Sequence, residues 1–383
     1  MIFVEVLQPM SKIGKMLFAI AILAFMAMLV IYPAEFLEAG REAIRLCLDV
    51  IIPSLFPFLV AVGILTRIGL PRYMSRNLSP LMRPIFNIPG SGALALVMGL
   101  ISGYPLGAKI TRELYESGDC TKTEAERMLA FCNNSGPLFI VGAVGAGMLF
   151  SPAIGQILYV SHVLSAIAVG ILFKFYRKDC EHLMLPTTAL VVRKEQNPGI
   201  VSSIGDAVYS AAQTMAKICG FVILFAAVVS ALPNLGNQVA NAGAAGIFEI
   251  TEGVLLFAQI YGIPLPLKFA AISFILAFSG ISVMAQVAAI IKGSGLSMIP
   301  YVVGKFLAGI FSAGITFVIF ILTPLTLEPI SPVGGNALGV PNYGVAPTEP
   351  LQLFLGSLTA IALALAGIVA AVAIVRTWRK FKA

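Results

Sequence analysis

The sequence predicts an all-α polytopic membrane protein with two internal repeats, each carrying a broken or re-entrant helix hairpin, and with about 8–10 membrane segments. Three observations predict this class. The chain has 383 residues, of which 58% are hydrophobic and only 11% are charged, whereas soluble domains carry about 25% charged residues. Two long apolar runs are interrupted by polar residues, Gly and Pro. The second half of the chain contains similar interruptions in the same order.

The charged, cysteine and histidine residues argue against several other classes. The net charge is +7, but Lys and Arg cluster at the ends of apolar runs, where they set membrane orientation rather than bind nucleic acid. The five cysteines show no CxxC spacing and no Cys/His cluster. The two histidines, His162 and His182, lie in an apolar run and in a polar linker, and make a poor metal pair. We therefore expect no cofactor, no metal site and no nucleic-acid partner.

The first element expected is a retained membrane helix at 16–34. It follows Lys12 and Lys15 and carries no charge, and it is longer than the apolar region of a signal peptide, about 7–15 residues. Acids and bases then alternate from Glu35 to Arg45, which predicts a segment at the membrane interface.

The second apolar run, 50–66, is followed by several arginines and no acid. Short loops with this composition stay in the cytoplasm, so the N-terminus is expected there as well. The arginines are Arg67, Arg72, Arg76 and Arg83.

The next run, 91–110, is split at Ser102–Pro105. Each half has about ten residues, or about 15 Å of helix, which is half of a hydrocarbon core of about 30 Å. A re-entrant hairpin is the simplest geometry, and a break at membrane depth needs a protected cavity for its backbone groups. Gly99, Gly103 and Gly107 recur every four residues, a spacing that indicates close helix packing and is compatible with a hairpin tip.

Two overlapping capping-box patterns, Thr121-x-x-Glu124 and Thr123-x-x-Glu126, predict a helix start. From 128 to 173 the chain carries no formal charge, which is enough for two spans. The break at Asn133–Pro137 lies inside this stretch, and Ser151–Pro152 predicts a turn. Lys174, Arg177 and Lys178 then return the chain to the cytoplasm.

The second half repeats the first. Ile85–Ile88 matches Ile247–Ile250, and Ser102–Gly103 matches Ser279–Gly280, if a short insertion near 259–267 is allowed. The basic C-terminus favours a cytoplasmic tail, and an additional crossing at 246–263 would reconcile that tail with the repeat. The expected divisions are 1–44 (N-terminal helix and interfacial segment), 45–178 (first repeat), 179–204 (cytoplasmic linker), 205–325 (second repeat) and 326–383 (external loop, last helix at 351–376 and basic tail).

Four motifs resemble the YlbJ-type sporulation integral membrane proteins, which belong to the wider nucleoside-transporter/FeoB Gate-domain group. The resemblance covers roughly 37–325. It implies a protein that moves dipicolinic acid across the outer forespore membrane, with distant kinship to concentrative nucleoside carriers. Ser279 stands where a second glycine is expected, and Glu252 where an asparagine is expected. The motifs are SGYPLGAK (102–109), EAERMLAFCNNSGPLFIVGAVG (124–145), FEITEG (248–253) and SGISVMAQ (279–286).

Polar groups inside an apolar span are costly unless they are paired, so those at the breaks are candidates for function. The serines can equally bond helix backbones, Glu249 can take up a proton or cation or merely solvate an interface, and lysines commonly snorkel to headgroups. The predicted substrate-binding residues are Ser102, Gly103, Tyr104, Asn133, Asn134, Ser135, Glu249, Thr251, Ser279, Gly280, Ser282 and Gln286, with Lys109 and Lys217 as candidate charge partners.

The expected function is secondary-type transport of a small anionic solute, dipicolinic acid by the resemblance, in the cell membrane or the outer forespore membrane. The alternatives are a carrier of nucleosides or of another small polar solute or ion, and a membrane assembly protein without transport. The sequence has no HExxH, GxSxG or P-loop motif, so we do not expect an enzyme. The expected partners are the lipid bilayer and a small-molecule anion, and a homo-oligomer is compatible with them.

Overall fold

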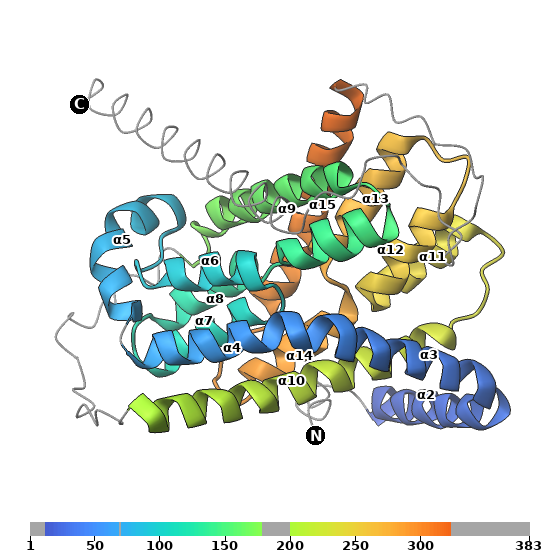
Figure 1. Cartoon of the computed structure of the whole chain (residues 1–383), viewed down its shortest axis with the longest axis horizontal. Coiled ribbons are helices and arrows are strands. Elements are labelled where there is room, and N and C mark those ends of the chain that lie inside the picture. Colours follow the sequence, from blue (N-terminus) through green and yellow to red (C-terminus); the bar gives the residue numbers. More distant parts are fainter. Residues whose placement is uncertain (1–11, 69, 178–199, 323–383) are drawn as a thin grey trace.

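The computed structural model describes residues 12–68, 70–177 and 200–322, and every regular element in these ranges is a helix (Figure 1). Four helical stretches are long and apolar enough to cross a membrane: Pro152–Phe173, Ile204–Ser230, Leu265–Ile291 and Ile299–Leu322. The predicted all-α polytopic membrane fold is therefore confirmed. The described ranges contain fewer full-length crossings than predicted, because several apolar runs are split into halves. The expected helix at 351–376, the loop before it and most of the linker lie outside the described residues.

The N-terminal segment is bent instead of straight. Helix α2 spans Lys12–Ile31 and α3 spans Pro33–Leu46, and the two are inclined by 98°. Proline has no N–H to donate and favours the first position of a helix, so Pro33 ends one helix and starts the next. The single helix predicted at 16–34 is thus corrected to a bent pair.

The chain continues through a π-helical turn, η1 (Cys47–Ile51), into α4 (Ile52–Arg67). Helices α3 and α4 pack along α10, which spans Ile200–Ser230, and Figure 1 shows α4 and α10 side by side. Arg67 at the end of α4 forms an ion pair of 2.7 Å with Asp206 near the start of α10, so the two helices are antiparallel.

The first predicted break is present. After α5 (Leu70–Phe86), α6 (Gly92–Ser102) and α7 (Leu106–Glu116) pack against each other as a hairpin. Gly103 between them has a φ of +90°, a conformation that favours glycine. A Cβ atom on Gly99 or Gly107 would overlap the carbonyl of Cys132. The three glycines spaced four residues apart therefore have two roles: Gly103 allows the hairpin turn, and Gly99 and Gly107 allow close packing.

The second break separates α8 (Lys122–Cys132) from η2, a π-helix at Leu138–Met148, and α9 (Pro152–Phe173) follows. Of the two capping patterns, Thr121 with Glu124 forms the capping box. Ser151 caps α9, as the predicted turn requires. Between α7 and α8, burial and then the charges of Glu124 and Asp119 raise the pKa of the Cys120 thiol well above its usual value, so this thiol is neutral and inert.

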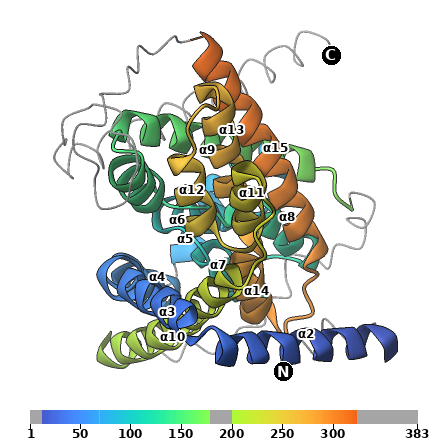
Figure 2. The ribbon, with the colours of Figure 1, turned by 90° about the vertical axis from the view of Figure 1, so that its right-hand side faces the viewer.

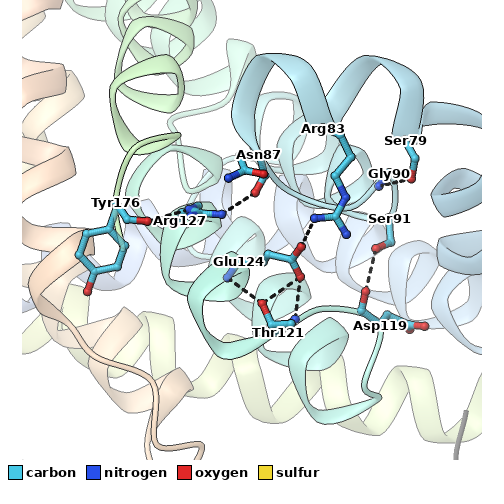
Figure 3. A network of polar contacts seen from close by, with 10 residues as sticks. All are labelled: Ser79, Arg83, Asn87, Gly90, Ser91, Asp119, Thr121, Glu124, Arg127 and Tyr176. Carbon is cyan, nitrogen blue, oxygen red and sulfur yellow. Dashed lines mark hydrogen bonds and ion pairs between the residues drawn. The ribbon is translucent and has the colours of Figure 1, made fainter. Parts of the chain in front are cut away.

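A polar network fixes the start of α8 (Figure 3). Arg83 of α5 pairs with the capping carboxylate of Glu124. The guanidinium of Arg127 is fully buried and donates to the backbone carbonyls of Asn87, at 2.8 Å, and Tyr176, at 2.7 Å. These contacts join α8 to the end of α5 and to the end of α9. These contacts fix the position of α8. They therefore also fix the position of the second break, which follows the end of the helix at Cys132.

Glu126 extends this anchoring into the second half of the chain. Its buried carboxylate accepts from Tyr176 OH at 3.1 Å, pairs with Arg177 at 3.2 Å, and accepts from the backbone N–H of Ser297 at 3.1 Å. Ser297 lies just before α15, so one carboxylate ties the first half to the start of the last described helix.

The second half contains two further breaks. Helices α11 (Gln238–Phe248) and α12 (Ile250–Gln259) are separated at Glu249, so 246–263 is two short helices and not an additional crossing. Helices α13 (Leu265–Phe278) and α14 (Gly280–Ile291) are separated at Ser279, whose φ is 73°. The last described helix, α15, spans Ile299–Leu322 and runs beside α13 (Figure 2).

The order of elements allows a second register for the predicted repeat. In the first half α6–α7 precede α8–η2 and α9, as α11–α12 precede α13–α14 and α15 in the second half. In this order the break at Ser102–Pro105 would match the break at Glu249, and Asn133–Pro137 would match Ser279. The pairing of Ser102–Gly103 with Ser279–Gly280 stays a prediction.

Candidate functional site

The breaks of the two halves meet at a cavity of about 130 Å³. A water molecule needs about 10–15 Å³ of such volume, so the cavity holds several waters or a small solute. Its walls come from the first three breaks, from α14, and from apolar residues of α10, η1 and η2. The predicted site residues that line it are Ser102, Gly103, Tyr104, Ser135, Glu249, Thr251, Ser282 and Gln286.

Within each half the two breaks touch through glycine backbone. A Cβ atom on Gly136 would lie 2.8 Å from the carbonyl oxygen of Ile101, at the first break. In the second half, a Cβ atom on Gly280 would lie 3.2 Å from the carbonyl oxygen of Phe248, and Gly280 has a φ of +64°. Such approaches leave no space for larger side chains, so the breaks pack as pairs.

The predicted residues Asn133 and Ser279 lie behind the cavity wall, where they join the halves. The Asn133 amide nitrogen donates to Tyr301 OH at 3.2 Å, and that hydroxyl lies 3.2 Å from Ser279 Oγ. The side-chain oxygen of Asn133, Oδ1, accepts from the backbone N–H of Ala108 at 3.3 Å. A second link crosses the halves where Tyr104 OH donates to the carbonyl of Leu276 at 3.1 Å.

Side chains also form hydrogen bonds with the backbone N–H and carbonyl groups that the second break leaves without helical partners. The Asn134 amide nitrogen donates to the carbonyl of Phe131 at 2.7 Å. The backbone N–H of Ser135 donates to His162 Nε2 at 3.1 Å. His162 was not predicted as a site residue, and its role is to hold the break. Exposed backbone groups in an apolar medium require such partners.

Two cavity groups are available to a bound molecule. Ser102 Oγ is buried in the wall and has no hydrogen-bond partner within the described residues. The Glu249 carboxylate caps α12, accepting from the backbone N–H of Glu252 at 2.9 Å and from Thr251 Oγ1 at 3.3 Å. Both donors are neutral groups of its own helix, so these contacts give the carboxylate no opposite charge.

The predicted charge partners do not line this cavity. Lys109 is half-buried and donates to Ser210 Oγ at 3.1 Å, and Lys217 is exposed on α10. Lys305 of α15, which was not predicted, is fully buried. Its Nζ lies 3.4 Å from both Tyr104 OH and Asn134 Oδ1. The sequence feature that could have identified Lys305 is that it is a lone lysine inside the apolar segment 299–322.

Comparison with known proteins gives one relevant relative. The chain is 34% identical over 348 residues to the sporulation integral membrane protein YlbJ of Bacillus subtilis (strain 168), over 82% of this chain and 85% of that protein. No protein-family model and no solved structure match the chain.

Proposed function

The chain belongs to the family of the sporulation integral membrane protein YlbJ, and from this premise we propose that it carries a small dianion, dipicolinic acid, across a membrane of the sporulating cell. The resemblance of its motifs implies the outer forespore membrane as the site of action. The structure establishes the coarser part of this description, an integral membrane protein.

The observation that carries the proposal is the cavity at the meeting point of breaks from both halves. Secondary transporters bind solute and coupling ion at the interface between repeats, where helices are interrupted. A helix bent only for packing has no need of a cavity whose wall holds a hydroxyl without a partner among the described residues, such as Ser102 Oγ. This favours a carrier over an assembly protein.

The cavity offers a carboxylate several kinds of favourable contact. Helices α7, η2, α12 and α14 all begin at the breaks, and helix starts carry partial positive charge and free amide donors. Hydroxyls of Ser102 and Ser282 and the amide of Gln286 line the same space. These groups offset part of the desolvation cost of a dianion.

Flux in proteoliposomes tests the proposal. We expect purified protein to give saturable uptake of labelled dipicolinate that excess unlabelled dipicolinate abolishes, while excess nucleoside has no effect. Empty liposomes serve as the control. Saturable nucleoside uptake without dipicolinate uptake would favour a nucleoside carrier, and flux of neither solute would favour an assembly protein.

The buried carboxylate of Glu249 leads to a prediction about charge. A carboxylate beside the cavity disfavours a bound dianion, because like charges repel. Glu249→Gln keeps an oxygen to cap α12 but removes the acidic group, so it should lower the KM for dipicolinate. The measurement is the KM for dipicolinate uptake by each protein at one pH.

The matched control is Glu252→Gln on the same helix, because Glu252 is the acidic neighbour of Glu249 and does not line the cavity. This variant should keep the wild-type KM for dipicolinate. An unchanged KM in Glu249→Gln would show that Glu249 is only a helix cap.

A further inference from the structure

We infer that Lys305 is the residue that makes the cavity select anionic over neutral solutes, by placing an ammonium group behind its wall. This inference rests on the proposed function and names the charge that determines its specificity.

The first observation is that Lys305 is buried and that no acidic side chain among the described residues contacts it. Lys305 is 0% exposed, and its two hydrogen-bond partners, Tyr104 OH and Asn134 Oδ1, are neutral. Both distances are 3.4 Å, at the long end for a hydrogen bond. An ammonium has three donors, so these contacts hold the group in place and leave donor capacity unused. In a membrane interior an ionisable group of this kind indicates function.

The second observation is position. Tyr104 lines the cavity, and Lys305 Nζ lies 5.0 Å from the centre of its ring. The Tyr104 hydroxyl donates to the carbonyl of Leu276, which leaves its oxygen free to accept from the lysine. The ammonium therefore lies against the ring of a residue that lines the cavity. In a medium of low dielectric a charge acts strongly over such a distance.

The third observation is the contrast with another buried lysine. Lys268 of α13 is 2% exposed, but its Nζ donates to the carbonyls of Ala258 at 2.6 Å and Ile260 at 2.9 Å. These carbonyls end α12, and a lysine at a helix C-terminus has a structural role. Lys305 touches no helix end in this way. Its contacts are to the first and second breaks, where the solute is proposed to bind.

These observations explain why an anion would bind. A buried charge with no counter-charge is costly, and a carboxylate arriving in the cavity reduces that cost. A neutral solute of the same shape brings no such gain. The discrimination therefore depends on the charge of Lys305 and not on the size of the cavity.

The experiment compares binding of two isosteric probes, dipicolinate and the neutral pyridine-2,6-dicarboxamide, to detergent-purified protein by calorimetry. For Lys305→Met we expect dipicolinate affinity to fall by about 30-fold or more, the effect of truncating one partner of a buried charge pair. Affinity for the dicarboxamide should change less than about threefold. Lys305→Arg keeps the charge and should retain most of the preference for dipicolinate.

Lys268→Met and Lys217→Met are the matched controls, one buried and structural, the other exposed. Folded protein of either variant should keep the wild-type preference. If Lys305→Met does not fold, Asn134→Asp provides a second test, because it places a carboxylate beside the ammonium and cancels its charge. Equal loss of both probes in Lys305→Met would overturn the inference. If that variant does not fold, undiminished dipicolinate binding by folded Asn134→Asp would overturn it. Failure of wild-type protein to bind dipicolinate would instead overturn the proposed function.

Discussion

Replacing Asn133 and Asn134 together with alanine should reduce dipicolinate uptake by on the order of 100-fold, while the protein still inserts in the membrane. The double variant removes four hydrogen bonds, to Ala108 N, Phe131 O, Tyr301 OH and Lys305 Nζ. Each buried group left without a partner costs about 1–3 kcal/mol. The four lost hydrogen bonds hold the second break against the first break and against α15. The shape of the cavity depends on these contacts.

Initial rates of uptake in proteoliposomes, at equal protein incorporation, measure this effect. Asn241→Ala is the matched control. Asn241 lies in the first turn of α11, its side-chain oxygen accepts from the backbone N–H of Leu235 in the exposed turn before that helix, and it does not line the cavity. Its rate should stay within about twofold of wild type. Uptake by the double variant at the wild-type rate would contradict a role for the second break in transport. In cells, the double variant should yield spores that form but lack dipicolinate.

Gly107→Ala should have the largest effect on stability. Gly107 lies in α7 where the end of α8 comes closest, and an added Cβ would overlap the Cys132 carbonyl and lie 2.9 Å from the Asn133 Cα. Both neighbours are backbone, so no rotamer change relieves the overlap. Overpacking of a core costs about 1–3 kcal/mol, and backbone overlap places this substitution at or above the upper end.

The measurement is the melting temperature of the purified protein in detergent, followed by size-exclusion chromatography after heating. Gly243→Ala on α11 is the control, because a Cβ there meets nothing within 4 Å. Alanine favours helix over glycine by about 0.8–1.0 kcal/mol, so this variant should be at least as stable as wild type. If Gly107→Ala melts at the wild-type temperature, α7 and α8 do not pack as closely as described.

Features governed by local rules were predictable from the sequence. Hydropathy and the scarcity of charge determined the membrane class, because an apolar run has no other stable environment. Thr121 with Glu124 marked a helix start correctly and Ser151 with Pro152 marked a turn, since caps and turns depend only on residues within one turn. The breaks at Ser102–Pro105, Asn133–Pro137 and Ser279 were also found, because Gly and Pro act on the backbone at their own positions. The breaks at Pro33 and Glu249 were missed.

The identity of the interacting groups was not predictable in the same way. Most of the predicted polar residues reach one cavity, but Lys109 and Lys217 do not line it and Lys305 adjoins it. A single lysine in an apolar run looks the same in sequence whether it snorkels to the headgroups or is buried. Which of these happens depends on the helices packed around it.

The sequence by itself thus determined the class, the start of α8 and three of the breaks in the described residues. Only the tertiary structure decided where the remaining breaks lie, which breaks touch, and which charge lies behind the cavity. Helix packing brings Tyr104, Asn134 and Lys305 together from three separate segments. Contacts between distant segments depend on the shape and close approach of whole helices, and a local pattern of residue types does not encode them.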